Sequence, residues 1–433
     1  MTHYATPPPG VEGDEATLAR SAMDTTFLHW GLHAWAIYVV VGLAIAYAVH
    51  RKGRPVSIRW ALEPLFGEKV NGFWGDLIDV IAIVGAVFGV ATSLGFGVTQ
   101  VGAGLEFLDV VDTVTDGLLV VLIVAITALA LISVVTGLDK GIRILSNINM
   151  GLAAVLLLVL VLGPTVFILS DFFQQIGSYL QNLPRLAFEN YSFRGEDGAG
   201  WLAGWTTYYW GWWMSWAPFV GIFIARISRG RTVREFVLGV MLAPTLLTCL
   251  WFTVLGGSAL HREIFGSGGL VDPEGGVSTN TALFQLLEGL PLGPVLCVIA
   301  IFLVVVFFVT SSDSGSFVVG MISSGGAPNP RAWNRAFWAA LEGALAAVLL
   351  LAGGLAALQT MSILVALPSS IVMVLMVVAT FKALGGEVRQ LADRRREDFR
   401  VSIVEQVSDD LAAERDLGPV KSPTGAGPFR RRR

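Results

Sequence analysis

Charge and cysteine are both scarce in this sequence of 433 residues. Charged side chains make up 14% of it and hydrophobic side chains 54%, whereas a typical soluble domain has roughly 25% charged residues. A chain with so little charge cannot cover a water-exposed surface of this size, so lipid is the expected solvent. The two cysteines, Cys249 and Cys297, lie inside apolar runs. They are expected to be small core residues rather than a disulfide or a metal pair.

Three further patterns are missing from the sequence. No basic patch carries interleaved aromatic residues, so nucleic acid is not an expected partner. No cluster of His, Asp or Glu and no nucleophile motif is found at depth in the apolar runs, which speaks against an enzyme. The polar first 25 residues lack the basic-then-apolar order of a signal peptide.

The apolar residues are concentrated in long runs. A membrane-spanning helix needs about 20 mainly apolar residues, and runs of this length fit helices rather than the strands of a barrel. The sequence therefore predicts an all-α polytopic membrane protein. Nine spans are expected, at about 28–50, 74–101, 115–137, 146–170, 202–226, 232–258, 292–312, 335–356 and 361–384.

Polar segments flank and interrupt these runs. We expect a polar external N-terminal segment over residues 1–25, a transmembrane domain over 26–385 and a charged cytoplasmic tail over 386–433. Residues 172–188 combine apolar side chains at helical spacing with glutamine, serine and asparagine between them. That pattern is typical of an amphipathic helix lying in the membrane interface, here on the outer face.

The loops between the expected spans alternate in charge. The loop after the first span holds Arg51, Lys52 and Arg54, whereas acidic residues dominate the loop after the second. By the positive-inside rule, the odd-numbered loops and the C-terminus are cytoplasmic, in a multi-pass protein of the inner (plasma) membrane. This orientation makes the N-terminus external, although no signal sequence precedes it. An odd number of additional helices upstream would place the N-terminus in the cytoplasm.

Aromatic residues gather in one segment, since six of the 13 tryptophans fall between residues 201 and 216. Tyr209, Trp212, Trp213 and Trp216 follow the spacing of one helix face. The tryptophans near the outer end fit an interfacial belt, but Trp213 and Trp216 lie about two to three turns deeper. A buried aromatic face suits a quaternary ammonium ion, which donates no hydrogen bonds and is held by cation–π contacts.

Three other features of the sequence each allow two interpretations. The first span holds a second aromatic group, which fits belt packing as well as a ligand site: Trp30, Trp35 and Tyr38. The adjacent hydroxyls of Thr310 and Ser311 either bind a cation or bond back to their own helix. Asp313 is the one acid identified close to an apolar core, where it marks a functional site or the cytoplasmic end of its helix.

Several segments resemble the betaine/choline/carnitine transporter (BCCT) family. The longest and most specific match covers residues 210–236, which begin Trp-Gly-Trp-Trp-Met-Ser-Trp-Ala-Pro-Phe. Residues 29–38 resemble the family's aromatic helix, and residues 307–314, Phe-Phe-Val-Thr-Ser-Ser-Asp-Ser, resemble its sodium-site helix. The resemblance covers about residues 20–385 and includes the linking segments 85–105 and 141–149.

The resemblance implies a leucine-transporter-type inverted-repeat helix bundle that binds its substrate near the middle of the membrane. It assigns an aromatic cage and the substrate pathway to these residues: Trp30, Trp35, Tyr38, Trp212, Trp213, Trp216 and Phe219. It assigns sodium ligation to the carbonyl of Phe307 and the hydroxyls of Thr310 and Ser311, with no cofactor beyond this coupling ion. A homotrimer surrounded by membrane lipids is also implied, and the basic C-terminal tail is expected to respond to anionic lipid.

The sequence departs from the family's pattern in two places. Sodium-coupled members have threonines where this chain has Ala86 and Val90, although Thr92 and Ser93 lie one turn on. A second sodium is therefore not expected. The family's glycine-rich first core helix would precede Thr2, so we expect an N-terminally truncated chain whose bundle lacks that helix and whose cage lacks one wall.

Taken together, these features predict a secondary active transporter, a symporter that takes up a quaternary-ammonium osmolyte such as glycine betaine or choline by alternating access. Sodium is the expected driving ion. The alternatives are a proton-coupled or exchange-type carrier of choline or carnitine, a ligand-binding membrane sensor, and an inactive fragment of the same family. Comparing uptake with equilibrium binding separates a transporter from a sensor.

Overall fold

The computed structural model describes residues 1–136 and 139–416 of the chain. These residues form helices joined by turns and loops, and no strand occurs among them, as the apolar runs predicted. Contacts divide the chain into two units, Met1–Thr380 and Phe381–Arg433. The division falls close to residue 385, where composition places the end of the transmembrane domain.

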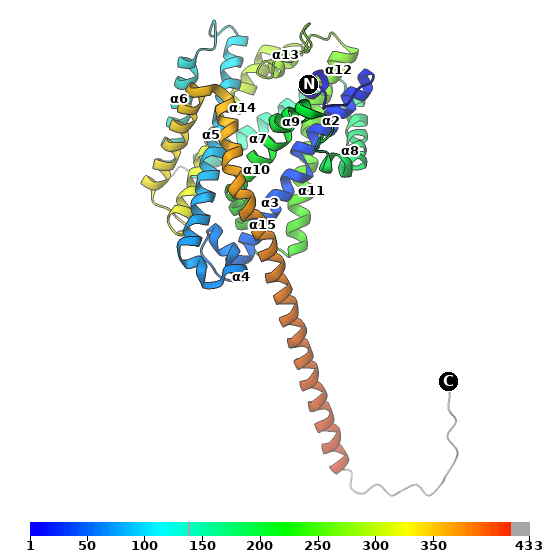
Figure 1. The fold of residues 1–433 in the computed structure, drawn as a ribbon, viewed down its shortest axis with the longest axis vertical. Coiled ribbons are helices and arrows are strands. Elements are labelled where there is room, and N and C mark those ends of the chain that lie inside the picture. The colour runs from blue at the N-terminus through cyan, green and yellow to red at the C-terminus, as the bar shows by residue number, and fades with distance from the viewer. Residues whose placement is uncertain (137–138, 417–433) are drawn as a thin grey trace, which may run out of the picture. The chain divides into compact units, whose positions relative to one another are not determined.

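Most helices follow one another with short connections, and residues 266–281 form a longer loop between α12 and α13 (Figure 1). The symbol η marks a 3₁₀ or π segment. The elements are α1 (Thr2–Ala5), α2 (Glu15–Trp30), α3 (Leu32–Ala46), η1 (Tyr47–Arg51), η2 (Ile58–Leu62), α4 (Glu63–Phe66), η3 (Gly67–Asn71), α5 (Phe73–Phe107), α6 (Asp116–Thr136), α7 (Asp139–Leu162), α8 (Thr165–Phe188), α9 (Gly195–Leu202), η4 (Ala203–Thr207), α10 (Tyr208–Ile227), α11 (Val233–Phe252), η5 (Thr253–Gly257), α12 (Ser258–Phe265), α13 (Ala282–Glu288), α14 (Gly293–Ser323) and α15 (Ala332–Asp416).

Seven helical segments among the described residues are long and apolar enough to cross a membrane. They are Glu15–Arg51, Phe73–Phe107, Asp116–Thr136, Ile144–Leu162, Val233–Phe265, Gly293–Ser323 and Ala332–Leu411. The expected count of nine differs for two reasons. The last two expected spans are both parts of α15, and the span expected at 202–226 corresponds mainly to α10, whose tryptophans and tyrosines lower its mean hydropathy.

Large apolar side chains cover the outside of several of these helices. On α6 and α11 many of them are exposed, including Val121, Val124, Ile132, Leu242 and Leu247. So many exposed apolar groups would be unfavourable in water, whereas they match the hydrocarbon of a bilayer.

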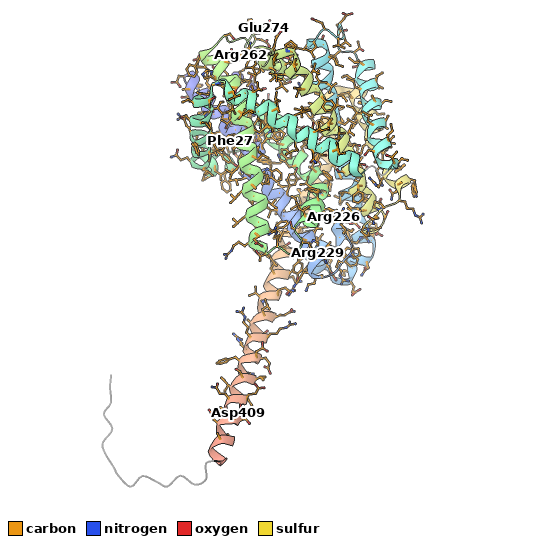
Figure 2. All side chains as sticks on the ribbon, turned by 180° about the vertical axis from the view of Figure 1, so that it is seen from behind. Phe27, Arg226, Arg229, Arg262, Glu274 and Asp409 are labelled. Carbon is orange, nitrogen blue, oxygen red and sulfur yellow. The ribbon has the colours of Figure 1, made fainter. Side chains whose placement is uncertain are left out.

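Charged residues sit at the two ends of the Met1–Thr380 unit. Arg226 and Arg229 lie at one end, and Glu274 and Arg262 lie at the other (Figure 2). The N-terminus lies at the same end as α12 and α13 (Figure 1). The basic loop residues Arg226 and Arg229 thus lie at the end opposite to Glu274, while the orientation in the membrane stays a prediction.

The first span begins earlier than expected. Residues 1–25 were expected to be an external polar segment, but α2 begins at Glu15, where the Asp14 side chain accepts a hydrogen bond from the Thr17 amide at 2.9 Å. The polar residues of α2 are tolerated because they pack against another helix: Asp24 accepts hydrogen bonds from Ser178 and Asn182 of α8, both at 2.9 Å.

The first residues of the chain also pack against the bundle, although residues 12–17 are exposed. His3 of α1 is buried, with its ring centroid 4.2 Å from that of Trp205 and 5.7 Å from that of His29. Burial lowers the pKa of His3 to about 3, so its imidazole is neutral at physiological pH. Part of the N-terminal segment therefore belongs to the packed bundle.

The span expected at 146–170 is divided by a break. Helix α7 ends at Leu162 and α8 begins at Thr165, with Gly163 and Pro164 between them. Proline cannot donate a backbone hydrogen bond, and it disfavours a helical conformation in the residue before it. The amphipathic helix expected at 172–188 is therefore the C-terminal part of a longer helix, α8.

A second break separates α2 from α3 at Gly31. The last carbonyls of α2 and the first N–H groups of α3 lack partners within their helices. Side chains from distant helices supply them: the Trp213 indole donates to the His29 carbonyl at 2.8 Å, and the Leu32 N–H donates to the Tyr179 hydroxyl at 3.3 Å. The break is thus fixed by tertiary contacts and places Trp30 at the end of α2.

We predict that Gly31→Ala lowers the stability of the bundle. A Cβ at this position would lie 2.5 Å from the Phe27 carbonyl oxygen, so the break would have to shift, at a cost of about 1–3 kcal/mol. The apparent melting temperature in detergent measures the effect. Gly177→Ala is the matched control, because nothing lies within 4 Å of its added Cβ. A melting temperature for Gly31→Ala equal to or above that of the control contradicts the prediction.

Helix α15 contains a reversal of chain direction (Figure 1). Gly353 and Gly354 have non-helical backbone angles, with φ of 63° and ψ of −153° at Gly354, a region that favours glycine. Arg335, in the first half, pairs with Asp313 of α14, and Leu358, in the second half, accepts a hydrogen bond from Thr92 of α5 at 3.0 Å. The two halves correspond to the spans expected at 335–356 and 361–384.

Candidate functional site

A cavity of about 540 Å³ lies between the first span, α5, α10, α11 and α14. Aromatic rings form much of its wall, and hydroxyl groups contribute the polar part. Its lining comprises Trp30, Ala34, Trp35, Tyr38, Ser93, Phe96, Trp212, Trp213, Trp216, Val220, Thr248, Val304, Phe307, Phe308 and Ser311. Six of the seven residues assigned to the substrate thus line one cavity. Of the three residues assigned to the cation, Phe307 and Ser311 line it too.

The rings of this aromatic cluster contact one another across three helices. Trp212 and Trp213 are stacked, with centroids 5.3 Å apart and planes inclined by 15°. Trp30 meets Trp213 edge to face at 4.8 Å, and Tyr38 meets Trp213 in the same manner at 6.1 Å. Trp35 is placed by an edge contact of 5.4 Å with Tyr38. Such contacts fix the rings beyond their burial alone, so the wall of the cavity is preorganised.

Hydrogen bonds fix the indoles of α10 further. Trp212 donates to the Ser93 hydroxyl at 3.2 Å, and Trp216 donates to the same hydroxyl at 3.1 Å and to the Gly89 carbonyl at 3.0 Å. Trp213 donates to the carbonyl of His29, as described above. Because the ring N–H groups are occupied by protein atoms, these side chains offer the cavity their π-systems.

A second cavity, of about 1080 Å³, adjoins the first. Phe219 and Thr310 line this second cavity and not the first. Four residues line both cavities: Trp35, Val220, Phe307 and Ser311. The second cavity extends to Arg231 and Glu235, at the start of α11. Phe219 therefore lies beyond the aromatic cluster, in edge-to-face contact with Trp216 at 5.3 Å.

The oxygen atoms assigned to sodium lie on one part of α14. The Thr310 hydroxyl is 3.0 Å from the Phe307 carbonyl oxygen and 2.9 Å from the Val306 carbonyl oxygen. This is the back-bonding geometry weighed as the alternative for Thr310, and it also places two of the assigned oxygens side by side. Ser311 lines both cavities at their shared wall.

The hydroxyls considered as replacements for a second sodium site have other partners. Thr92 donates to the Leu358 carbonyl at 3.0 Å, and Ser93 donates to the Gly89 carbonyl at 3.0 Å while accepting the two indole N–H groups. Ala86 and Val90 are buried and offer no side-chain oxygen. These contacts assign Thr92 and Ser93 to helix packing and ring placement.

Sequence reasoning missed several residues of the cavity wall. Phe96 of α5 lies 5.7 Å from Trp212, and Thr248 of α11 and Phe308 of α14 complete the lining. Phe96 belongs to the segment 85–105 that resembles the family, which was a usable signal. Tyr209, by contrast, shares the helical spacing of Trp213 but stacks on His29 at 4.8 Å instead of lining the cavity.

Asp313 is not the only acid within the bundle. Glu342 lies inside the span expected at 335–356 and is fully buried, with an exposed fraction of 0%. Asp313 is paired with Arg335 at 3.2 Å, whereas the Glu342 carboxyl group accepts a hydrogen bond from the Ser312 hydroxyl at 3.1 Å. Sequence reasoning overlooked Glu342, although its position inside an apolar run was a usable signal.

Known transporters resemble this chain over most of its length. The model of a family described as BCCT, betaine/carnitine/choline family transporter, matches residues 1–389. The chain is 54% identical over 390 residues to an uncharacterized transporter of Mycobacterium tuberculosis, with 88% of this chain and 65% of that protein covered. It is 46% identical over 399 residues to the glycine betaine transporter OpuD of Bacillus subtilis, covering 92% of this chain and 77% of that protein.

A third relative is a glycine betaine transporter of Acinetobacter baylyi, 44% identical over 385 residues. The match covers 89% of this chain and 57% of that protein. The chain spans only 65% of the length of the Mycobacterium tuberculosis relative. Since the family match extends over the whole Met1–Thr380 unit, the chain belongs to the betaine/carnitine/choline family of transporters, which are not enzymes.

Proposed function

We propose that this protein is a secondary active transporter that takes up a quaternary-ammonium osmolyte, such as glycine betaine or choline, across the plasma membrane. The observation that carries the proposal is the cavity of about 540 Å³ walled by Trp30, Trp35, Tyr38, Trp212, Trp213 and Trp216. Its size suits a small ligand, and its rings suit a cation surrounded by methyl groups. Relatives named as glycine betaine transporters support this choice of substrate class.

The aromatic rings and the oxygen atoms of α14 have different roles in this proposal. The rings around Trp213 hold the trimethylammonium group, each contact contributing about 0.5–2 kcal/mol when water is excluded. The Phe307 carbonyl and the Thr310 and Ser311 hydroxyls hold one sodium ion, because a hard cation is bound by oxygen ligands. Ser311 lines the cavity that holds the rings, so the ion and the substrate favour each other's binding through α14.

The second cavity is assigned to the inner part of the pathway. It adjoins the cage at Trp35 and Ser311 and reaches Arg231 and Glu235 at the start of α11. This start follows the basic loop that the positive-inside rule places in the cytoplasm. Alternating access then opens the cage to this cavity on one side and to the outer face on the other. Phe219 lines this path rather than the cage.

The experiment that tests the function compares uptake with binding in proteoliposomes. Radiolabelled glycine betaine and choline are expected to accumulate above equilibrium when a sodium gradient is applied, and to leak out when the gradient is collapsed. Binding without accumulation would instead favour the sensor. Uptake that follows a pH gradient and ignores sodium would favour the proton-coupled carrier.

The proposal extends to assembly and location. We infer a homotrimer in the plasma membrane with the C-terminal segment on the cytoplasmic side, on the strength of the family resemblance and of the basic loops. The basic residues of that segment would meet anionic lipid headgroups. The mass of the detergent-solubilised complex tests the trimer, and labelling of a cysteine added near the C-terminus from either side of the membrane tests the orientation.

A further inference from the structure

Glu342 of α15 is a fully buried acid for which the proposed transport cycle has no use. Its exposed fraction is 0%, and it lies within one of the apolar segments long enough to cross a membrane. The Ser312 hydroxyl of α14 donates to its Oε2 atom at 3.1 Å. Its Oε1 atom is buried and has no hydrogen-bond partner among the described residues. Buried acids at such depth in a membrane protein are costly and are usually retained for a function.

Neighbouring helices close around this carboxyl group. A Cβ added to Gly315 of α14 would lie 3.6 Å from Oε1 of Glu342 and 2.9 Å from Val90 of α5. A Cβ added to the next residue of α15, Gly343, would lie 2.3 Å from the hydroxyl of Thr127 on α6. That hydroxyl is also buried and has no partner in the described part of the chain. Glycine at 315 leaves room for Val90 of α5, and glycine at 343 leaves room for Thr127 of α6. The carboxyl group is therefore buried where α5, α6, α14 and α15 pack closely together.

No described cation is paired with Glu342. On α14 the acid Asp313 faces Arg335 of α15, and these two groups pair with each other at 3.2 Å. The acids of α5 and α6 lie toward the ends of those helices, and neither helix contains a lysine or an arginine. These acids are Asp76, Asp79, Glu106 and Asp116. Nothing in the described surroundings therefore balances a negative charge at Glu342.

The protonation state follows from these contacts. An ionised carboxylate here would have one hydroxyl donor and a second oxygen in apolar surroundings, which is strongly unfavourable. A neutral acid keeps a hydrogen bond with Ser312 and leaves only an uncharged oxygen without a partner. The neutral form is thus the one that the site accommodates.

We propose that Glu342 is a proton-binding site, that it holds a proton at neutral pH, and that transport requires this proton to be retained. Losing it would place a charge between α15 and the turn of α14 that holds Thr310 and Ser311. Ser312 carries the effect, because it is bonded to Glu342 and follows Ser311 directly in the sequence. The consequence for transport rests on the proposed function, whereas the bound proton does not.

Infrared spectroscopy of the purified full chain tests the proton directly. At pH 7 the wild type is expected to show the carbonyl-stretch band of a buried neutral carboxylic acid, and Glu342→Gln is expected to lack it. Asp116→Asn, at an exposed acid that begins α6, is the matched control and should leave the band unchanged. Absence of the band from the wild type at pH 7 overturns the proposal.

A second variant keeps the test decisive if Glu342→Gln does not fold. Ser312→Ala retains the acid but removes its hydrogen-bond partner, so the same band is expected to move to higher frequency. A band that stays in place in Ser312→Ala does not come from Glu342 and overturns the assignment. The infrared measurement needs no transport activity, so it tests the bound proton even if the proposed function is wrong.

The pH profile of uptake tests the requirement for the proton. Wild-type uptake is expected to fall about tenfold per pH unit once Glu342 ionises at alkaline pH, whereas Glu342→Gln, an uncharged isostere, is expected to keep its uptake there. Measuring both proteins with internal and external pH held equal removes any contribution of a proton gradient. The same alkaline decline in both proteins overturns the proposed role in transport.

Discussion

Replacing Thr310 and Ser311 together with alanine is expected to abolish the stimulation of uptake by sodium. The change removes two side-chain oxygens and leaves the Phe307 carbonyl, which lies 3.0 Å from the Thr310 hydroxyl, without its neighbouring ligands. A sodium site with too few oxygens no longer compensates for the ion's lost hydration. Uptake of radiolabelled glycine betaine in sodium buffer, compared with potassium buffer, measures the effect.

The matched control for this experiment is the double change Ser369→Ala with Ser370→Ala. These two residues are also adjacent hydroxyls on a spanning helix, and each bonds back to its own helix, at 3.0 Å and 2.7 Å. Sodium stimulation should survive in the control. If wild-type protein shows no response to sodium in the first place, the assignment of Thr310 and Ser311 is wrong.

Trp213→Leu is expected to keep the fold but weaken the binding of quaternary-ammonium substrates. Leucine preserves apolar bulk and removes the ring that contacts Trp30 at 4.8 Å and Trp212 at 5.3 Å. The expected loss is about 1–2 kcal/mol, or several- to thirtyfold in affinity. Titration with glycine betaine and choline, followed by the fluorescence of the remaining tryptophans, measures it.

Trp74→Leu provides the comparison, because Trp74 has an exposed fraction of 60% and lies outside both cavities. Its affinity should match that of the wild type. Trp213→Phe adds a graded test, since it restores a smaller π-face without the indole N–H that bonds to His29. Equal affinities for both substrates in wild type and Trp213→Leu would exclude Trp213 from the cage.

Hydropathy located the membrane-spanning helices, because apolar runs of about 20 residues match the thickness of the bilayer's hydrocarbon core. It misplaced boundaries where packing overrides composition. The polar start of α2 is stabilised by hydrogen bonds from Ser178 and Asn182 to Asp24, and a pairing between residues so distant in sequence cannot be read from either segment. Gly163 and Pro164 indicate a break in the helix, but the apolar residues that follow them suggested one continuous span.

Only part of the aromatic cluster was predictable, because contacts between distant helices cannot be read from the sequence. The spacing on α10 puts Trp212, Trp213 and Trp216 on one face, and the family resemblance adds the first span. Periodicity says nothing about which other helices approach, so Phe96 and Thr248 were missed. The inverted repeats and the bound sodium ion stay predictions.

The reversal at Gly353 and Gly354 has a consequence for biosynthesis. The two halves of α15 meet there without a polar loop, so almost no hydrophilic chain has to be moved across the bilayer between them. The halves are therefore suited to leave the translocon together, as one helical hairpin. A side chain at Gly354, where φ is 63°, would strain this corner. Such a substitution would lower the yield of protein inserted in the membrane more than the transport rate of the molecules that do insert.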